Sequence, residues 1–210
     1  MTDPRLQQFG SIPFGHGALL PVLKDYRRPN DKIAEWLRQG ALLPLKRGQY
    51  VRGDTDAAPC LPLVANHLYG PSCVSLDYAL AWHGLIPERV HEVTSVCTGR
   101  GRIIDNPLGR FSYARLPAAV YPCGITQASA SPRETFLIAS PAKALCDKVL
   151  LTPHLRATSR ASMQRYLLED LRIDAGMLPG LDLEVVRAYA ACGSKTSQLR
   201  ALLHCVEALQ

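Results

Sequence analysis

The spacing of apolar and polar residues near the start of the chain predicts one well-defined helix, from Asn30 to Gly40. At about 100° per residue the apolar side chains of this segment fall on one face, with Asn30 as the expected N-cap and Gly40 as the expected stop. The apolar face consists of Ile33, Ala34, Trp36 and Leu37, and the opposite face is centred on Asp31, Glu35 and Gln39. An earlier short helix is expected over residues 16–25, and a complete three-helix unit is not evident before Pro29.

Two strands are expected directly after this helix. Residues 41–45 and 49–52 have strand-like patterns and flank the basic turn Lys46-Arg47-Gly48. The order of helix, glycine stop, strand, basic turn and strand is that of the recognition helix and wing of a winged helix-turn-helix. The segment therefore predicts a helix that enters a DNA groove and a wing that touches backbone phosphate.

The segment Gly53–Pro59 is small, polar and proline-ended, which favours a linker between two domains. We expect a DNA-binding domain over residues 1–53, a linker over residues 54–59 and a second domain over residues 60–210. In the second domain the pattern predicts helices over residues 60–69, 76–83, 141–151, 159–171, 181–191 and 194–209, with Ser75, Ser140 and Ser194 as caps. Strands are expected over residues 92–98, 102–105, 110–116, 120–126 and 135–139. The expected fold is α+β, with an N-terminal winged helix-turn-helix followed by a mixed α/β domain that ends in helices.

The composition is that of a soluble globular protein. The chain has 210 residues, of which 47% are hydrophobic, so it can bury a substantial core. No apolar run approaches the ~18 residues of a membrane span, and the first residues lack the pattern of a signal peptide, so we expect a cytoplasmic protein. The formal net charge of +6 favours a nucleic acid or an acidic protein as partner. Most of the excess lies between His16 and Arg52, where eight residues are basic and three are acidic.

The expected DNA-binding residues surround the helix and the turn. They are Lys24, Arg27, Arg28, Asn30, Lys32, Arg38, Gln39, Lys46, Arg47 and Arg52. Their cations would neutralise phosphates and release counterions, while Gln39 is suited to adenine. The alternative is a solvated hairpin with ordinary surface charge. The acidic Asp31 and Glu35 favour that alternative, because acids on the exposed face of the helix repel phosphate.

A second set of basic residues falls on neighbouring strands of the second domain. These residues are Arg100, Arg102, Arg110 and Arg115. Together they would make a positive face for RNA, a nucleotide or an acidic protein. The alternative is that they are ordinary solvent-facing residues, because polar side chains alternate along a half-exposed strand.

The residues that carry catalytic chemistry form no pattern that predicts an enzyme. The six histidines show no HExxH or paired spacing, and Gly193-Ser194-Lys195-Thr196 lacks the glycine spacing and residue order of a phosphate loop. The seven cysteines include no CxxC pair, which favours reduced thiols in the core over a zinc site or a disulfide framework. We expect no catalytic residue, no metal and no cofactor.

Four segments resemble the AbiEi-like antitoxins of type IV toxin–antitoxin pairs, which are linked to abortive phage infection. The segments are LKRGQYVRG, LVANHLYGPSCVSLDYALAWHGLIPERV, TSVCTGRGRIIDNPLGRFSYARLP and TFLIASPAKALCDKVLL, and the similarity covers roughly residues 30–151. The resemblance implies an N-terminal winged helix that binds inverted repeats in its own promoter and represses the operon. It also implies a C-terminal domain that neutralises a nucleotidyltransferase toxin of the AbiEii type.

Carried onto this chain, the DNA role falls on the helix at residues 30–40 and the turn at residues 46–48. The antitoxin role falls on the second domain, with the four arginines named above as candidates. The expected function is therefore a stoichiometric, non-catalytic autorepressor and antitoxin. Two alternatives stay open: a protein-interaction module without DNA binding, and an enzyme acting on nucleic acid or a nucleotide. A gel shift with the chain's own upstream DNA separates the first alternative, and a turnover assay separates the second.

Overall fold

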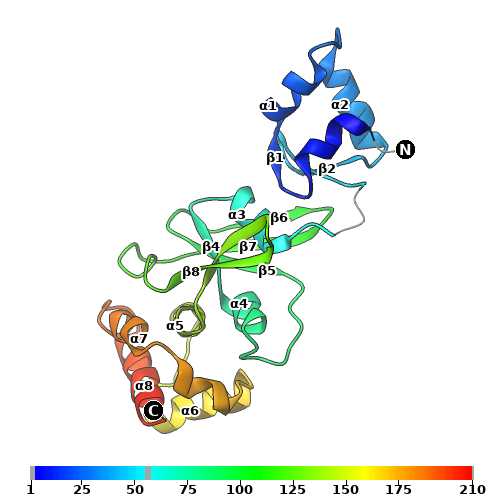
Figure 1. The fold of residues 1–210 in the computed structure, drawn as a ribbon. Coiled ribbons are helices and arrows are strands. Elements are labelled where there is room, and N and C mark those ends of the chain that lie inside the picture. Colours follow the sequence, from blue (N-terminus) through cyan, green and yellow to red (C-terminus); the bar gives the residue numbers. More distant parts are fainter. Residues whose placement is uncertain (1–2, 55–57, 210) are drawn as a thin grey trace.

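The computed structural model describes residues 3–54 and 58–209 of the chain. These residues form an N-terminal lobe (residues 3–54) and a larger second lobe (residues 58–209), with the C-terminal helices at the end farthest from the N-terminal lobe (Figure 1). Each lobe has its own β-sheet with helices packed around it. The protein is thus α+β, as the sequence predicts. The expected linker over residues 54–59 lies partly outside the described residues.

The N-terminal lobe consists of short helices around a three-stranded sheet. Its elements are the 3-10 helix η1 (Pro4–Phe9), β1 (Phe14–Gly15), α1 (His16–Leu19), the 3-10 helix η2 (Pro21–Leu23), α2 (Pro29–Arg38), β2 (Leu42–Lys46) and β3 (Gln49–Arg52). The strand order is β1-β3-β2, and both pairings are antiparallel. A small core fills this lobe, formed by Leu6, Leu19, Leu23, Ile33, Trp36, Leu42 and Tyr50.

Helix α2 occupies the segment where the sequence predicts a helix, with small differences at its start and on its apolar face. Pro29 is the first helical residue, where its fixed φ suits a helix, so the N-cap is Arg28 and not the expected Asn30. Gly40 has φ +72°, the left-handed conformation that ends a helix. The buried face consists of Ile33 and Trp36, whereas Ala34 is exposed although the sequence pattern placed it on the apolar side.

The second lobe is built around a six-stranded mixed sheet. Its strands are β4 (Ser72–Val74), β5 (Val93–Cys97), β6 (Arg102–Asn106), β7 (Gly109–Arg115), β8 (Ile125–Ser131) and β9 (Glu134–Ala139), in the order β6-β7-β5-β4-β9-β8. The hairpin β6–β7 turns at the segment where the sequence predicts a turn. Strands β6 and β8 form the two edges of this sheet, and β8 contains no charged residue and no proline.

Helices cover the sheet and form the far end of the lobe. They are α3 (Leu61–Leu68), α4 (Leu76–Trp82), α5 (Pro141–Leu151), α6 (Arg160–Arg165), the π-helix η3 (Tyr166–Asp170), the 3-10 helix η4 (Ala175–Gly180), α7 (Leu183–Ala190) and α8 (Thr196–Glu207). Helix α5 starts as the sequence predicts, because the Ser140 hydroxyl accepts a hydrogen bond from the Lys143 amide. No helix in the part of the chain that the structure describes is long and apolar enough to cross a membrane.

Three expectations for the second lobe were wrong. The strand expected over residues 120–126 begins only at Ile125, because the preceding residues form turns that include Gly124 at φ +74°. Ser75 precedes α4 but does not cap it, since its hydroxyl donates instead to Asp147. Helix α8 has Lys195 at its N-cap position, not the expected Ser194.

Candidate nucleic-acid interface

The outer loop of the N-terminal lobe and the first turn of α2 carry four of the expected DNA-binding residues. This loop joins η2 to α2 and lies at the end of the lobe remote from the second lobe (Figure 1). Lys24, Arg27, Arg28 and Asn30 are all exposed there. Arg28 lies 3.9 Å from Asp31, and both side chains are largely exposed, so the pair is weak. Lys24 and Arg27 form no side-chain hydrogen bond or ion pair within the described residues.

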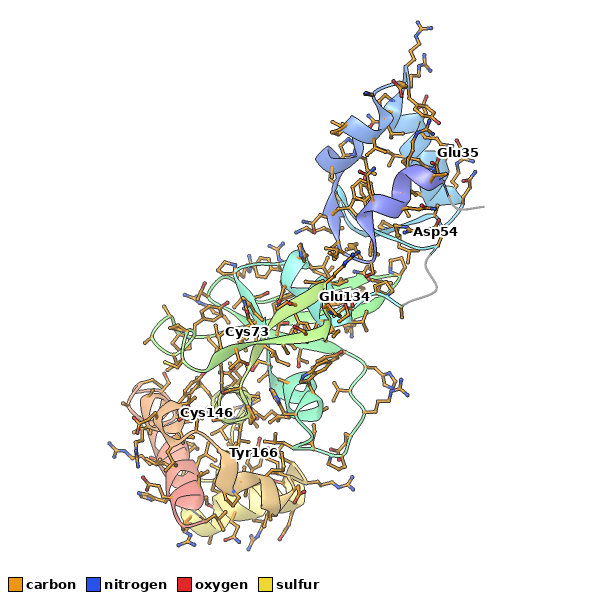
Figure 2. All side chains as sticks on the ribbon, in the orientation of Figure 1. Glu35, Asp54, Cys73, Glu134, Cys146 and Tyr166 are labelled. Atoms are coloured by element: carbon orange, nitrogen blue, oxygen red, sulfur yellow. The ribbon has the colours of Figure 1, made fainter. Side chains whose placement is uncertain are left out.

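The polar side chains of α2 interact mainly with one another. The Lys32 ammonium lies 3.1 Å from a Glu35 carboxylate oxygen, and the Gln39 amide donates to the same oxygen at 2.9 Å. The hydrogen bond from Lys32 lowers the pKa of Glu35, so the carboxylate stays ionised. Lys32 also lies over the Trp36 ring, 5.7 Å from its centroid. The charge of Glu35 (labelled in Figure 2) is therefore balanced within the helix. Arg38 is exposed and also lowers the pKa of Glu35 by its charge, but it forms no side-chain hydrogen bond within the described residues.

The turn between β2 and β3 presents one free cation rather than two. Gly48 adopts φ +73°, and its carbonyl accepts a hydrogen bond from the His16 amide, which ties the turn to the start of α1. Arg47 is exposed, with no side-chain hydrogen bond or ion pair in the described ranges. The Lys46 ammonium instead donates to the Leu68 carbonyl at 2.5 Å. Leu68 is the last residue of α3, where a cation is favoured by the helix dipole.

Arg52 is also engaged within the protein. Its guanidinium nitrogen Nε donates to Asp54 at 3.1 Å, and its side chain is only 11% exposed. Of the ten expected DNA-binding residues, those free to meet a phosphate are therefore on the outer loop, on the exposed face of α2 and at Arg47. Lys46 and Arg52 serve contacts inside the chain.

The four arginines of the second lobe are exposed but do not form one face. On the β6–β7 hairpin, Arg102 pairs in register with Tyr113, and Arg110 pairs with Asp105. Because successive strand residues point to opposite sides of a sheet, Arg102 and Arg115 share one side and Arg110 lies on the other. Arg110 also forms a two-pronged ion pair with Asp105, at 2.9 and 3.4 Å. The expectation of a single basic face is therefore wrong for Arg110.

Two of the remaining arginines, Arg100 and Arg102, contact Tyr69, which follows α3. The Arg102 guanidinium lies over the Tyr69 ring at 4.7 Å from its centroid, and the Tyr69 hydroxyl donates to the Arg100 carbonyl at 3.1 Å. The ring of Tyr69 meets Tyr113 edge-on, with centroids 5.2 Å apart. This arrangement holds Arg102 in place by a cation–π contact while leaving its charge exposed.

A buried polar network, absent from the predictions made from the sequence, lies in the core of the second lobe. Asp147 accepts hydrogen bonds from Ser75, at 2.6 Å, and from Tyr189, and it lies 3.4 Å from the Lys143 ammonium. Lys143 also donates to the Tyr189 hydroxyl at 2.8 Å. Burial raises the pKa of Asp147. All four residues are fully buried, so the network joins α5 to α4 and α7 and is closed to a substrate. The signal in the sequence was a lysine and an aspartate four residues apart in a helix whose one other charged residue is Lys148.

The described residues contain no cluster of three or more side chains suited to hold a metal ion. Five of the seven cysteines are buried, and all seven are free thiols in the structure. Burial raises the pKa of Cys73 to about 12, so this thiol stays protonated near neutral pH.

Comparison with known proteins supports the fold. No family model matches the chain, and no curated protein matches it. Among solved structures, the chain is similar to the RV2827C protein from Mycobacterium tuberculosis, with a TM-score of 0.59 and 18% sequence identity. The similarity covers 94% of this chain and 72% of the other. The two proteins thus share an arrangement that extends over both lobes.

Proposed function

We propose that the protein is a DNA-binding transcriptional autorepressor and the antitoxin of a type IV toxin–antitoxin pair. Helix α2 acts as the recognition helix, and the β2–β3 hairpin acts as the wing. The second lobe neutralises a nucleotidyltransferase-type toxin by stoichiometric association. No step of this function needs a catalytic group or a cofactor.

The observation that carries the DNA-binding half is the order of elements in the N-terminal lobe. The 3-10 helix η1, the strand β1, the helical segments α1, η2 and α2, and the strands β2 and β3 follow one another, and the first strand pairs with the last. Helices α1 and η2 are separated only by Leu20 and together count as the second helix of the lobe, so α2 is the third. Winged helix domains have this order, with the third helix as the one that reads DNA. The order supports α2 as that helix, and η1 and β1 supply the leading elements that the sequence alone does not reveal.

The charges of the lobe support the same proposal. Lys24, Arg27 and Arg47 are exposed cations without an internal partner in the described residues, so they are available to phosphates. Arg38 is exposed as well, with Glu35 as a nearby charge. The acids on α2 have cationic neighbours, Arg28 beside Asp31 and Lys32 beside Glu35. This local balance weakens the argument that the acids of α2 exclude DNA.

The antitoxin half rests on the resemblance of residues 30–151 to the AbiEi-like antitoxins. The exposed cations beside Tyr69 support a role in contacting an acidic partner surface: Arg102 is held over the ring, and the Arg100 carbonyl accepts from the Tyr69 hydroxyl. Arg115 is exposed on the same side of the sheet as Arg102. Arg110 fits this role less well, because Asp105 neutralises it. Promoter DNA with inverted repeats and the cognate toxin are the two partners of the proposed function.

A salt titration of operator binding tests the DNA-binding half. The chain's own upstream DNA and a scrambled duplex of equal length are compared by fluorescence anisotropy. If Lys24, Arg27, Arg28, Arg38 and Arg47 each neutralise one phosphate, the slope of log K against log salt is about −4.5. Arg27→Ala should flatten this slope by about 0.9, whereas Arg165→Ala, which removes an exposed cation of the second lobe, should leave it unchanged. A flat salt response, or equal affinity for the scrambled duplex, would overturn this half.

Co-expression tests the antitoxin half. The product of a neighbouring nucleotidyltransferase-like reading frame should arrest growth alone, and the full chain should restore growth. The chain is expected to co-purify with that product. A persistent arrest in the presence of folded chain would show that the second lobe does not neutralise it.

A further inference from the structure

The β2–β3 hairpin contributes side chains to the cores of both lobes. In β3, Tyr50 belongs to the core of the N-terminal lobe, and the next residue, Val51, belongs to the core of the second lobe. Because side chains alternate along a strand, the two faces of the hairpin serve different cores. Leu42 and Leu45 of β2 are divided in the same way. Val51 and Leu45 are 0% and 2% exposed, so the second lobe covers them completely.

Polar contacts fix the end of this hairpin against the second lobe. Besides the contact between Lys46 and Leu68, the side-chain amide of Asn106 donates to the Leu45 carbonyl at 3.3 Å. Asn106 is the last residue of β6, and its side-chain oxygen accepts from the Leu108 amide in the following turn. The β6–β7 turn therefore holds Asn106 in a set orientation toward β2.

A third polar contact joins the lobes at another place. The Ser11 hydroxyl, in the loop before β1, donates to the Glu134 carboxylate at 2.5 Å. Ser131 donates to the other carboxylate oxygen at 3.0 Å, which orients Glu134 at the start of β9. Glu134 lies on the part of the second lobe that faces the N-terminal lobe (Figure 2). A hollow of about 480 Å³ borders this contact and is lined by residues 7–12 of one lobe and residues 131–133 of the other.

From these contacts we infer that the second lobe sets the position of the wing, and that Asn106 and Ser11 are positioning residues for DNA binding. The inference rests on the proposed function. Polar contacts at two separate places, with an apolar contact at the shared hairpin, oppose rotation of one lobe against the other. The two lobes thus present the hairpin and α2 to DNA as one body, although Asn106 itself does not meet DNA.

Two neutral substitutions test this role without removing a charge. Asn106→Ser keeps an oxygen for the Leu108 amide but is too short to reach Leu45. Ser11→Ala removes the donor to Glu134 at the other contact. Arg47→Ala is the control, because it removes a cation from the hairpin turn and no contact between the lobes.

The measurements are residual dipolar couplings of both lobes and the salt dependence of operator binding. In the parent chain the two lobes should give one alignment tensor, and in Asn106→Ser or Ser11→Ala the tensors should diverge. In these variants the lobe orientation that binds DNA becomes one of several. The apparent Kd for operator DNA should then rise by the same factor, about three- to tenfold, at every salt concentration. Arg47→Ala should instead flatten the salt slope by about 0.9 and leave one tensor.

Different tensors in the parent chain would overturn the inference, because the lobes would then move independently. Diverging tensors in the variants with an unchanged Kd would overturn it as well, since lobe position would not matter for DNA. If the parent chain fails to bind its upstream DNA while one tensor is seen, the proposed function fails, and with it the positioning role. A tensor measurement therefore separates failure of the junction from failure of DNA binding.

Discussion

The residues of this chain show how burial decides what a reactive side chain can do. Cys73 and Cys146 are fully buried in the second lobe, and burial holds the pKa of both thiols well above the ordinary value. The thiolate is the reactive form of cysteine. These two thiols are therefore protected from reagents for two reasons: they are buried, and they stay protonated. Cys123 and Cys192 are only partly buried.

We predict that a maleimide reagent labels Cys123 and Cys192 first at pH 7.5, and that Cys73 and Cys146 react only after unfolding. Intact-mass and peptide mass spectrometry over time gives the order. A sample unfolded in urea is the control, in which all seven thiols should react. Early labelling of Cys73 in the native protein would contradict its placement in the core.

The buried pair of Lys143 and Asp147 gives a second prediction for single residues. Asp147→Ala leaves the ammonium of Lys143 buried with only neutral partners, which should destabilise the protein by about 3–5 kcal/mol. Urea unfolding followed by circular dichroism measures the loss. Asp105→Ala is the control: it breaks the exposed pair with Arg110 and should change the midpoint little. Equal midpoint shifts for the two variants would contradict a stabilising role of the buried network.

At the scale of elements, turns set where strands and helices begin. Gly124 precedes β8 at φ +74°, and a Cβ there would lie 2.9 Å from both Lys143 Cβ and Ser140 Oγ. Gly84 has φ +73°, but an added Cβ would meet nothing within 4 Å. The two glycines therefore separate backbone strain from crowding.

We predict that Gly84→Ala costs about 1–2 kcal/mol, the penalty of the left-handed conformation alone. Gly124→Ala should cost about 1–3 kcal/mol more, because Ser140 and Lys143 at the start of α5 must move to admit the methyl group. Midpoints of urea unfolding compare the two variants. Equal unfolding midpoints for Gly124→Ala and Gly84→Ala would show that the start of α5 moves to admit the methyl group without loss of stability.

The elements also show how far the sequence predicts the fold. Local signals located α2, the β6–β7 hairpin and the start of α5 within a few residues, because glycine, proline and serine act on their own neighbours. The strand predicted over residues 120–126 was wrong at residues 120–124, because these residues form turns. The prediction that Ser75 caps α4 was wrong because its hydroxyl donates to Asp147, 72 residues further along the chain. No local pattern reveals such a partner.

At the scale of the whole molecule, the lobes cannot be separated without cost. The sequence favoured a boundary at the polar segment after Gly53, but Leu45 and Val51, which precede it, lie in the core of the second lobe. The same long-range contacts explain why Lys46 appeared to be a phosphate ligand. Its partner is a main-chain carbonyl, and main-chain groups leave no trace in the residue pattern.

We predict that a fragment of residues 54–210 is less stable than the full chain by about 4 kcal/mol or more, since two buried aliphatic side chains are lost from its core. Urea unfolding and the binding of a hydrophobic dye measure this difference. A fragment as stable as the second lobe of the full chain would contradict the contribution of Leu45 and Val51 to the core of that lobe. If such a fragment fails to neutralise the toxin, its lower stability and the loss of contacts between the N-terminal lobe and the toxin would both contribute to that failure.

The β8 edge of the larger sheet has a consequence for handling the protein. Its seven residues carry no charge and no proline, the two devices by which natural sheets discourage further strands from joining. The formal net charge of +6 keeps neighbouring copies apart in dilute buffer. High salt screens that repulsion and leaves the bare edge as the place where slow association, and loss of material on storage, should start.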